Sequence, residues 1–293
     1  MREAKQREIG SSATIGTDDV SLGVAMSSQK SFRNISTIWI LLLTLVGCGG
    51  GGGGGDGFAP TPTPDAAVGG IWVGTVSVAG QGVFELIGLV TEDGRGHFVQ
   101  EDGVQYWGTV TSSGNRITVT FNGATPIGTG FPDGSFSGSG SITGTISERN
   151  SITATSTFTT TNGTTTTGAV SLQYDSLYER NSSLSTIAGN YTNAIAPGSD
   201  SVNISSSGVL FGQVPSSSCV FNGQVTIIDS AYNAYDIRYT YSSCTGQEAI
   251  LNGSTFSGIG TLDNTVFPET AIAGLQGTVA GTPFAVVFIY ERT

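Results

Sequence analysis

The chain is poor in charged residues, and beyond Cys48 it contains no lysine at all. Charged residues make up 11% of the sequence, whereas roughly a quarter is usual in soluble domains. Long surface helices need Glu, Lys, Arg, Ala and Leu, so this composition excludes an architecture built on such helices. Glycine, at 44 of 293 residues, and abundant Ser, Thr and Asn suit short strands and tight turns instead. We therefore expect an all-β protein.

The scarcity of basic residues also restricts the partners of this protein. Residues 49–293 contain 18 acidic and 6 basic side chains, a net charge of −12. A segment with so much negative charge repels the phosphate backbone of nucleic acids, which argues against nucleic-acid binding. It also binds anionic lipid surfaces poorly, so any attachment to a membrane must come from another part of the chain.

Residue types that carry catalysis or bind metals are few. His97 is the sole histidine, and no Gly-x-Ser-x-Gly motif occurs in the sequence. A catalytic histidine would need a nucleophile and an orienting acid, and no motif supplies them, so we interpret His97 as a strand-surface residue. Residues 138–144 resemble a phosphate-binding loop, but they lack the lysine and the following helix. We expect no cofactor and no metal site.

An apolar segment at 35–46 follows a short basic stretch that contains Lys30 and Arg33. As a helix it would rise about 18 Å, which is too short for a bilayer core of about 30 Å. A basic head, a short apolar segment and a small residue before a cysteine are typical of a secretory signal peptide. We therefore assign residues 26–47 to a signal peptide.

The four residues Leu45-Val46-Gly47-Cys48 resemble the lipobox of bacterial lipoproteins. This resemblance, to a proteobacterial lipoprotein type, implies no activity. It does imply that Cys48 is acylated and becomes the mature N-terminus, which anchors the chain stably in a membrane, with palmitate among the acyl chains. Gly49 rather than Asp follows the cysteine, which implies sorting to the outer membrane of a Gram-negative cell. We expect the Gly- and Pro-rich residues 48–67 to form a tether.

Residues 1–25 do not suit a position upstream of a signal peptide, because they include four acidic side chains. We expect them to be a misassigned or disordered extension. Met1 and Met26 stay open as alternative start positions.

From residue 68 onward, apolar and polar residues alternate with period two, and turn signals recur every 8–12 residues. The run at 116–121 precedes Asn122-Gly123, and the run at 150–160 precedes Asn162-Gly163. Such spacing predicts antiparallel hairpins in a sandwich or barrel. Alternating glycines near 138–144 let a strand coil tightly, which favours closed barrels.

The two halves of the body share a weak internal repeat. The matching segments are 70–75 with 189–192, 90–100 with 204–213, 134–140 with 253–261, and 178–180 with 290–292. We therefore predict two tandem β domains, 68–181 and 182–293, each with six to eight short strands. The opening Gly-x-Trp at 70–72 resembles the first-strand motif of lipocalin-like barrels.

Cys219 and Cys244 remain if Cys48 is acylated, and two thiols in an exported protein are expected to pair. They flank a predicted hairpin formed by 224–229 and 235–241, so the two sulfur atoms can meet. Closing this loop would stabilise the fold by about 3.5 kcal/mol.

Aromatic residues are the remaining candidates for a binding face. They are Trp72, Trp107, Tyr235, Tyr239 and Tyr241. The three tyrosines share one face of a predicted strand by parity. Core packing is the competing interpretation, and a face for a glycan or peptide is the functional one.

Three functions stay open at this stage, and enzyme activity is not the leading one. The first is a lipid-anchored, non-catalytic binding module for a small apolar ligand, a glycan or an envelope protein. The second is a structural or adhesin-type surface lipoprotein, and the third is a carboxylate-based glycan hydrolase. An empty apolar cavity would favour the first, a filled interior the second, and two carboxyl groups about 5–10 Å apart in one cleft the third.

We expect Cys48→Ala to leave the protein soluble or unprocessed, because the substitution removes the acylated thiol. Membrane fractionation and metabolic acyl labelling measure this directly. Unchanged fractionation and labelling in the variant would refute the anchor.

Overall fold

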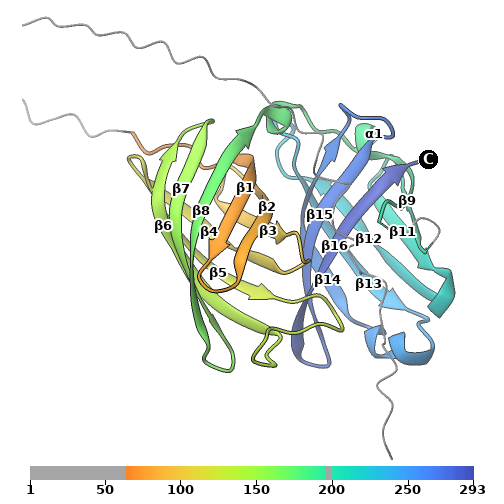
Figure 1. The fold of residues 1–293 in the computed structure, drawn as a ribbon. Coiled ribbons are helices and arrows are strands. Elements are labelled where there is room, and N and C mark those ends of the chain that lie inside the picture. The colour runs from red at the N-terminus through yellow and green to blue at the C-terminus, as the bar shows by residue number, and fades with distance from the viewer. Residues whose placement is uncertain (1–63, 196–198) are drawn as a thin grey trace, which may run out of the picture.

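The computed structural model describes residues 64–195 and 199–293, and these residues form two closed antiparallel β-barrels that lie side by side (Figure 1). The all-β prediction with two tandem barrels is confirmed, and each barrel has eight strands, the upper end of the predicted number. Closure leaves no unpaired strand edge in either sheet.

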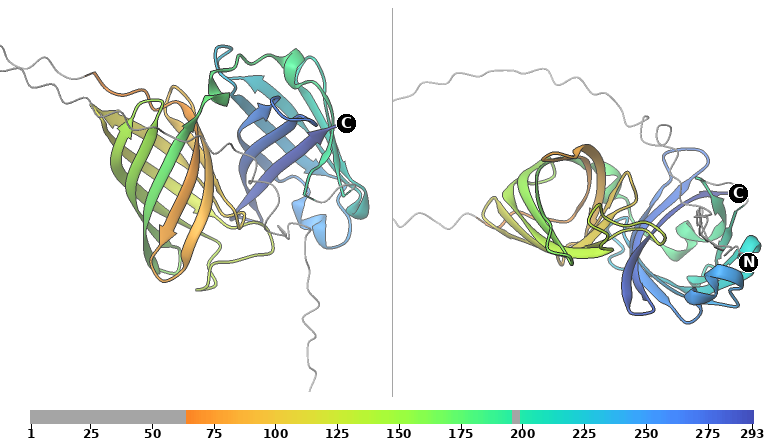
Figure 2. Two further views of the ribbon diagram at one scale, coloured as in Figure 1. Left: turned by 45° about the horizontal axis from the view of Figure 1, so that its top comes forward. Right: turned by 60° about the horizontal axis from the view of Figure 1, so that its bottom comes forward.

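The first barrel winds in simple chain order, and its last strand pairs with its first (Figure 2). Its strands are β1 (Gly70–Val78), β2 (Gly82–Val90), β3 (Arg95–Gln100), β4 (Gln105–Ser113), β5 (Arg116–Ala124), β6 (Ser137–Ser147), β7 (Ser151–Thr160) and β8 (Thr165–Asp175). A short connection with a 3₁₀ turn, η1 (Ser176–Glu179), and a single helical turn, α1 (Leu184–Ile187), leads to the second barrel.

The second barrel repeats this topology, with β16 paired to β9. Its strands are β9 (Gly189–Asn193), β10 (Ser201–Ile204), β11 (Val209–Val214), β12 (Cys219–Ile227), β13 (Tyr235–Ser242), β14 (Thr255–Asp263), β15 (Thr270–Val279) and β16 (Thr282–Arg292). The 3₁₀ turns η2 (Pro215–Ser217) and η3 (Gly246–Leu251) interrupt its loops.

Glycines on β6 let aromatic rings meet inside the first barrel. Gly140 pairs with Phe121 of β5 on one side and with Phe158 of β7 on the other. The two phenyl rings stack over it with centroids 6.0 Å apart. A Cβ atom at Gly140 would lie 2.6 Å from the Phe121 ring and 2.2 Å from the Thr157 carbonyl oxygen. Any side chain there would push the strands apart, so the small residues are needed for close approach.

The expected turn at Asn122-Gly123 is wrong, because β5 continues through both residues to Ala124. Gly123 instead makes room for two aromatic side chains: a Cβ atom there would lie 2.8 Å from the Tyr106 ring and 3.0 Å from the Phe158 ring. The Asn162-Gly163 turn is where the sequence predicts it, with Gly163 at a positive φ of 90°.

The repeat seen in the sequence corresponds to equivalent structure at the start of each barrel. Trp72 on β1 is fully buried and donates its indole N–H to the Val68 carbonyl oxygen, at 3.2 Å. Tyr191, at the same place on β9, is 1% exposed and donates its hydroxyl to the Ile187 carbonyl oxygen, at 2.7 Å. Both bonds reach back four residues, so each first strand is anchored to the segment before it in the same way.

The second pair of matching segments forms the same turn twice. Gly94 and Gly208 have φ values of 82° and 80°. The carbonyl oxygen of each accepts a 2.7 Å hydrogen bond from a backbone N–H two strands further on, that of Val110 or Val225. Only glycine fits, because a Cβ atom would lie 2.4 or 2.2 Å from the carbonyl oxygen of that same valine.

The segment pair 178–180 and 290–292 does not correspond in the structure. Tyr178 lies in η1, after the barrel has closed, whereas Tyr290 lies within β16. The residue that pairs with Trp72 is Tyr174, and the one that pairs with Tyr191 is Arg292. The sequence similarity there is therefore offset from the structural repeat.

The barrels are joined by a contact surface with polar and apolar parts. Arg95 of β3 forms a 2.8 Å ion pair with Asp236 of β13. The Ala285 N–H of β16 donates to the Thr125 carbonyl oxygen at 3.0 Å. The apolar part of the surface is formed by residues of both barrels and of η1. They are Ile71, Leu89, Tyr178, Ala234 and Ile259. Strands of each barrel are therefore in direct contact across a surface that is partly polar and partly apolar.

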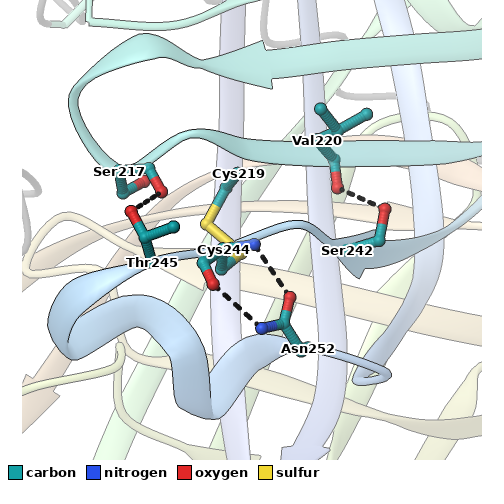
Figure 3. Close-up of a disulfide and its surroundings, with 7 residues drawn as sticks. All are labelled: Ser217, Cys219, Val220, Ser242, Cys244, Thr245 and Asn252. Atoms are coloured by element: carbon teal, nitrogen blue, oxygen red, sulfur yellow. Dashed lines mark hydrogen bonds between the residues drawn. A yellow bond between two sulfur atoms is a disulfide. The ribbon is translucent and has the colours of Figure 1, made fainter.

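The predicted disulfide between Cys219 and Cys244 is present and closes the β12–β13 hairpin (Figure 3). It lies just beyond the last strand pair, Val220 with Ser242. The carboxamide of Asn252 accepts from the Cys244 N–H at 2.8 Å and donates to its carbonyl oxygen at 3.0 Å (Figure 3). The disulfide therefore fixes both the hairpin end and the loop that follows it.

We expect the double substitution Cys219→Ala and Cys244→Ala to destabilise the protein by about 3.5 kcal/mol, because the unfolded chain regains the entropy of an open 25-residue loop. Denaturant unfolding measures this change. Dithiothreitol should lower the stability of the wild type to that of the variant and leave the variant unchanged. Equal midpoints for the variant and the oxidised wild type would contradict the prediction.

Candidate functional site

A cavity of about 500 Å³ lies inside the first barrel. Aliphatic and aromatic side chains of the barrel strands line its central part. They include Val76, Leu86, Phe98, Val119, Ile142 and Val170. The volume falls within the range of roughly 300–1,000 Å³ that is common for small-molecule sites.

One end of the first barrel is closed. Trp72 fills it together with buried residues such as Ile117 and Leu172. The chain before β1 crosses this end, where the Ala66 N–H donates to the Gly114 carbonyl oxygen at 2.9 Å and Ser112 donates to the Ala66 carbonyl oxygen at 2.7 Å. The cavity is therefore a cup rather than a channel.

The other end of the cavity is reached past turns and one long loop. Gln81, Asp102, Asp133 and Thr164 come from four different connections and line the cavity there. Phe131, in the loop between β5 and β6, packs on Phe158 with ring centroids 5.3 Å apart. We call this end, formed by the four connections and Phe131, the rim.

A chain of polar groups runs from the rim into the cavity. The Tyr106 hydroxyl donates to the Gln100 carboxamide oxygen at 3.1 Å, and the Gln100 amide nitrogen donates to the Asp102 carboxylate at 3.0 Å. The Val104 N–H gives Asp102 a second bond of 3.1 Å. Removal from water raises the pKa of the Asp102 carboxyl, partly offset by these donors. Burial also raises the pKa of Tyr106, so its phenol stays neutral.

The second rim carboxylate, Asp133, has a different environment. Its oxygens accept from the Ser135 hydroxyl at 2.6 Å, from the Ser135 N–H at 3.0 Å, and from the Thr160 hydroxyl. Hydrogen bonds from the Ser135 and Thr160 side chains hold the pKa of Asp133 well below its usual range. Asp133 is therefore a fixed negative charge at the rim.

The second barrel has a packed interior instead. Its core includes Tyr191, Phe221, Tyr235, Tyr239, Phe256, Leu275 and Phe288. Tyr235, Phe256 and Leu275 are fully buried. The aromatic side chains occupy the space that is empty in the first barrel.

The aromatic candidates from the sequence fall in different places. Trp72, Tyr235 and Tyr239 are core side chains, and each has at most 2% of its surface exposed. Tyr241 is half-buried and packs on Tyr239, with ring centroids 5.3 Å apart. The parity argument for the tyrosines is confirmed, because all three join the core of the second barrel.

Trp107 alone among these candidates lies at a depression outside a barrel. It lines a shallow groove of about 360 Å³ together with Asn122, Ser139, Thr159 and Pro283. Its ring stacks on His97 with centroids 6.0 Å apart.

A carboxylate-based hydrolase would need paired acids, and two acids of the first barrel, Glu85 and Glu148, do not line the cavity. Glu85 on β2 and Glu148 after β6 are both exposed, and Glu148 accepts a hydrogen bond from the Ala67 N–H at 3.2 Å. Arg149 pairs with Glu179 rather than with its neighbour Glu148. The carboxylates that do line the cavity are Asp102 and Asp133.

Sequence reasoning missed the cavity residues as a group. Aromatic residues and glycines do recur along these strands, as at Phe121, Gly140 and Phe158, and they pair with one another in the structure. The sequence shows the residue types but not which strands pair, so it could not place these residues on one wall.

Cys48 and the signal-peptide residues 26–47 lie outside the described residues. Within the described part, no helix is long and apolar enough to cross a membrane. The same residues contain no cluster of three or more potential metal ligands.

No protein-family model, curated protein or solved structure matches this chain.

His97 is not on the strand surface, so that interpretation is wrong. It is 5% exposed, and one ring nitrogen lies 2.6 Å from the Gln105 carboxamide oxygen. A Cβ atom at Gly274 of β15 would lie 2.3 Å from the imidazole, so the second barrel covers this residue. Removal from water lowers the pKa of His97 to about 4, although the bond to Gln105 opposes the shift.

We expect His97 to make stability fall with acidification. The unfolded chain binds a proton near pH 6.5 and the folded one only near pH 4, so stability is lost as pH falls between these values. Between pH 7.5 and 4.5 the wild type should lose about 2.5 kcal/mol more than His97→Gln. Urea unfolding at both pH values measures the difference, and equal losses in the two proteins would disprove it.

Proposed function

We propose that this protein is a non-catalytic binding module whose first barrel holds a small apolar molecule. The observation that carries the proposal is the 500 Å³ cup with apolar walls inside that barrel. An apolar ligand would gain about 25 cal/mol for each Å² of surface that it removes from water there. Polar groups at the rim would orient one end of the ligand.

The contrast between the barrels supports this proposal. Both have the same strand number and topology, and the interior of the second is packed with aromatic and aliphatic side chains. An eight-stranded barrel is just wide enough to be filled or to hold one small ligand. The first barrel has a cavity where the second has packed side chains, and such a cavity supports the binding of a small molecule.

We propose further that the protein is anchored by acylated Cys48 to the outer membrane of a Gram-negative cell. Support comes from the order of a basic head, an apolar segment and a lipobox-like sequence ahead of a glycine run. The tether would then hold the barrels near the membrane surface, where small apolar molecules are available.

A structural or adhesin role is the second candidate, and the packed interior of the second barrel favours it. A filled barrel offers a partner only its outer surface. The two roles are compatible if the second barrel supports the first. The hydrolase alternative has less support, because Asp133 already accepts three hydrogen bonds and the cavity wall is apolar.

Ile142→Trp should weaken binding of an apolar probe by at least about tenfold, or about 1.4 kcal/mol. Ile142 lies on β6 and lines the cavity, so an indole there would occupy ligand space. Fluorescence titration with the neutral probe N-phenyl-1-naphthylamine measures the affinity.

Thr143→Trp is the matched control, because it adds the same side chain one position along β6, where successive residues face opposite sides. Thr143 is exposed, so probe binding should match that of the wild type. Absence of probe binding to the wild type, or equal binding to the wild type and both variants, would refute the proposed site.

A further inference from the structure

The charges around the cavity all have one sign. Asp102 and Asp133 line it, and its lining residues include no lysine, arginine or histidine. The ion pairs of the described residues involve Asp93, Asp236, Glu179 and Glu269, so they leave both rim carboxylates without a cationic partner.

Neutral donors alone hold the two rim carboxylates. Asp102 accepts from the Gln100 amide and from a backbone N–H, and Asp133 accepts from two hydroxyls and a backbone N–H. These bonds orient the carboxylates but add no positive charge. A cation arriving at the rim would meet two fixed acceptors without having to displace a resident basic side chain.

Aromatic rings lie directly inside the rim. The Tyr106 ring meets Phe121 and Phe158 edge to face, with centroids 5.4 and 5.7 Å away, and Phe131 packs on Phe158. The faces of such rings attract ammonium groups, most strongly where water is excluded. Carboxylates over aromatic rings favour a cation, while the aliphatic wall below them favours a hydrocarbon chain.

We propose that the cavity binds an amphiphile with a cationic head, an amine or a quaternary ammonium group, at Asp102 and Asp133 and with its apolar chain directed toward Trp72. The inference rests on the proposed function and adds the chemical class of the ligand. Amphiphiles with carboxylate or phosphate heads are rejected, because the two rim carboxylates would repel their negative charge.

Three probes with the same twelve-carbon chain test this proposal on the full-length protein. They are dodecyltrimethylammonium, dodecanol and dodecanoate, each measured by displacement of N-phenyl-1-naphthylamine. The two ionic probes are kept below their critical micelle concentrations and dodecanol below its solubility limit. We expect the ammonium probe to bind at least about tenfold more tightly than dodecanoate, with dodecanol between them.

Asp102→Asn and the double substitution Asp102→Asn with Asp133→Asn should reduce this preference stepwise, because each substitution removes one negative charge from the rim. The single variant keeps the Ser135 and Thr160 contacts intact, so it remains informative if the double variant fails to fold. Glu85→Gln is the matched control, since Glu85 is an exposed acid on the wall of the same barrel. It should preserve the full preference.

The outcomes separate the two proposals. Equal affinity for all three probes, tighter binding of dodecanoate, or an unchanged preference in Asp102→Asn would overturn the cationic-head inference and leave the apolar site standing. If neither dodecanol nor the ammonium probe displaces the reporter, both proposals are overturned.

Discussion

Closure of an eight-stranded sheet is the constraint on which the rest of this structure depends. When the last strand pairs with the first, as β8 does with β1 and β16 with β9, the number of strands fixes the width of the interior. The residues that face inward then decide what the interior contains. In this protein the same closed frame yields a cup in one barrel and a solid core in the other.

The difference between the barrels does not come from one strand alone. The inward residues of β5 are Ile117, Val119 and Phe121, and those of β13 include Tyr235, Ile237 and Tyr239. Both strands direct aliphatic and aromatic side chains inward, so the contents of each interior depend on the inward residues of all eight strands together. The shared frame is preserved, including the glycine turns at Gly94 and Gly208 and the anchored aromatic side chain on each first strand. The two barrels thus share these backbone features while their interiors differ.

The second barrel also shapes the environment of the first. It covers the face of β3 that bears His97. His97 lies on the outside of the first barrel, and contact with the second barrel buries it. The contact also includes the loop between β5 and β6, where Thr125 lines the cavity and accepts a hydrogen bond from Ala285, while Asp102 and Asp133 line the cavity at the rim. The anionic character that the composition shows for the whole body is concentrated, at this rim, into two charges with no basic partner.

The sequence by itself determined the all-β class, the two tandem domains and the Cys219–Cys244 pair, because period-two alternation, turn residues and cysteine number are local or countable properties. It also indicated the barrel closure through the glycines of β6. It did not reveal that His97 is buried, that Asn122-Gly123 lies within a strand, or that Asp102 and Asp133 border one cavity. Those facts depend on which strands pair and which barrel faces touch. Residues far apart in the chain meet there, and only the tertiary structure decides how much space their side chains leave.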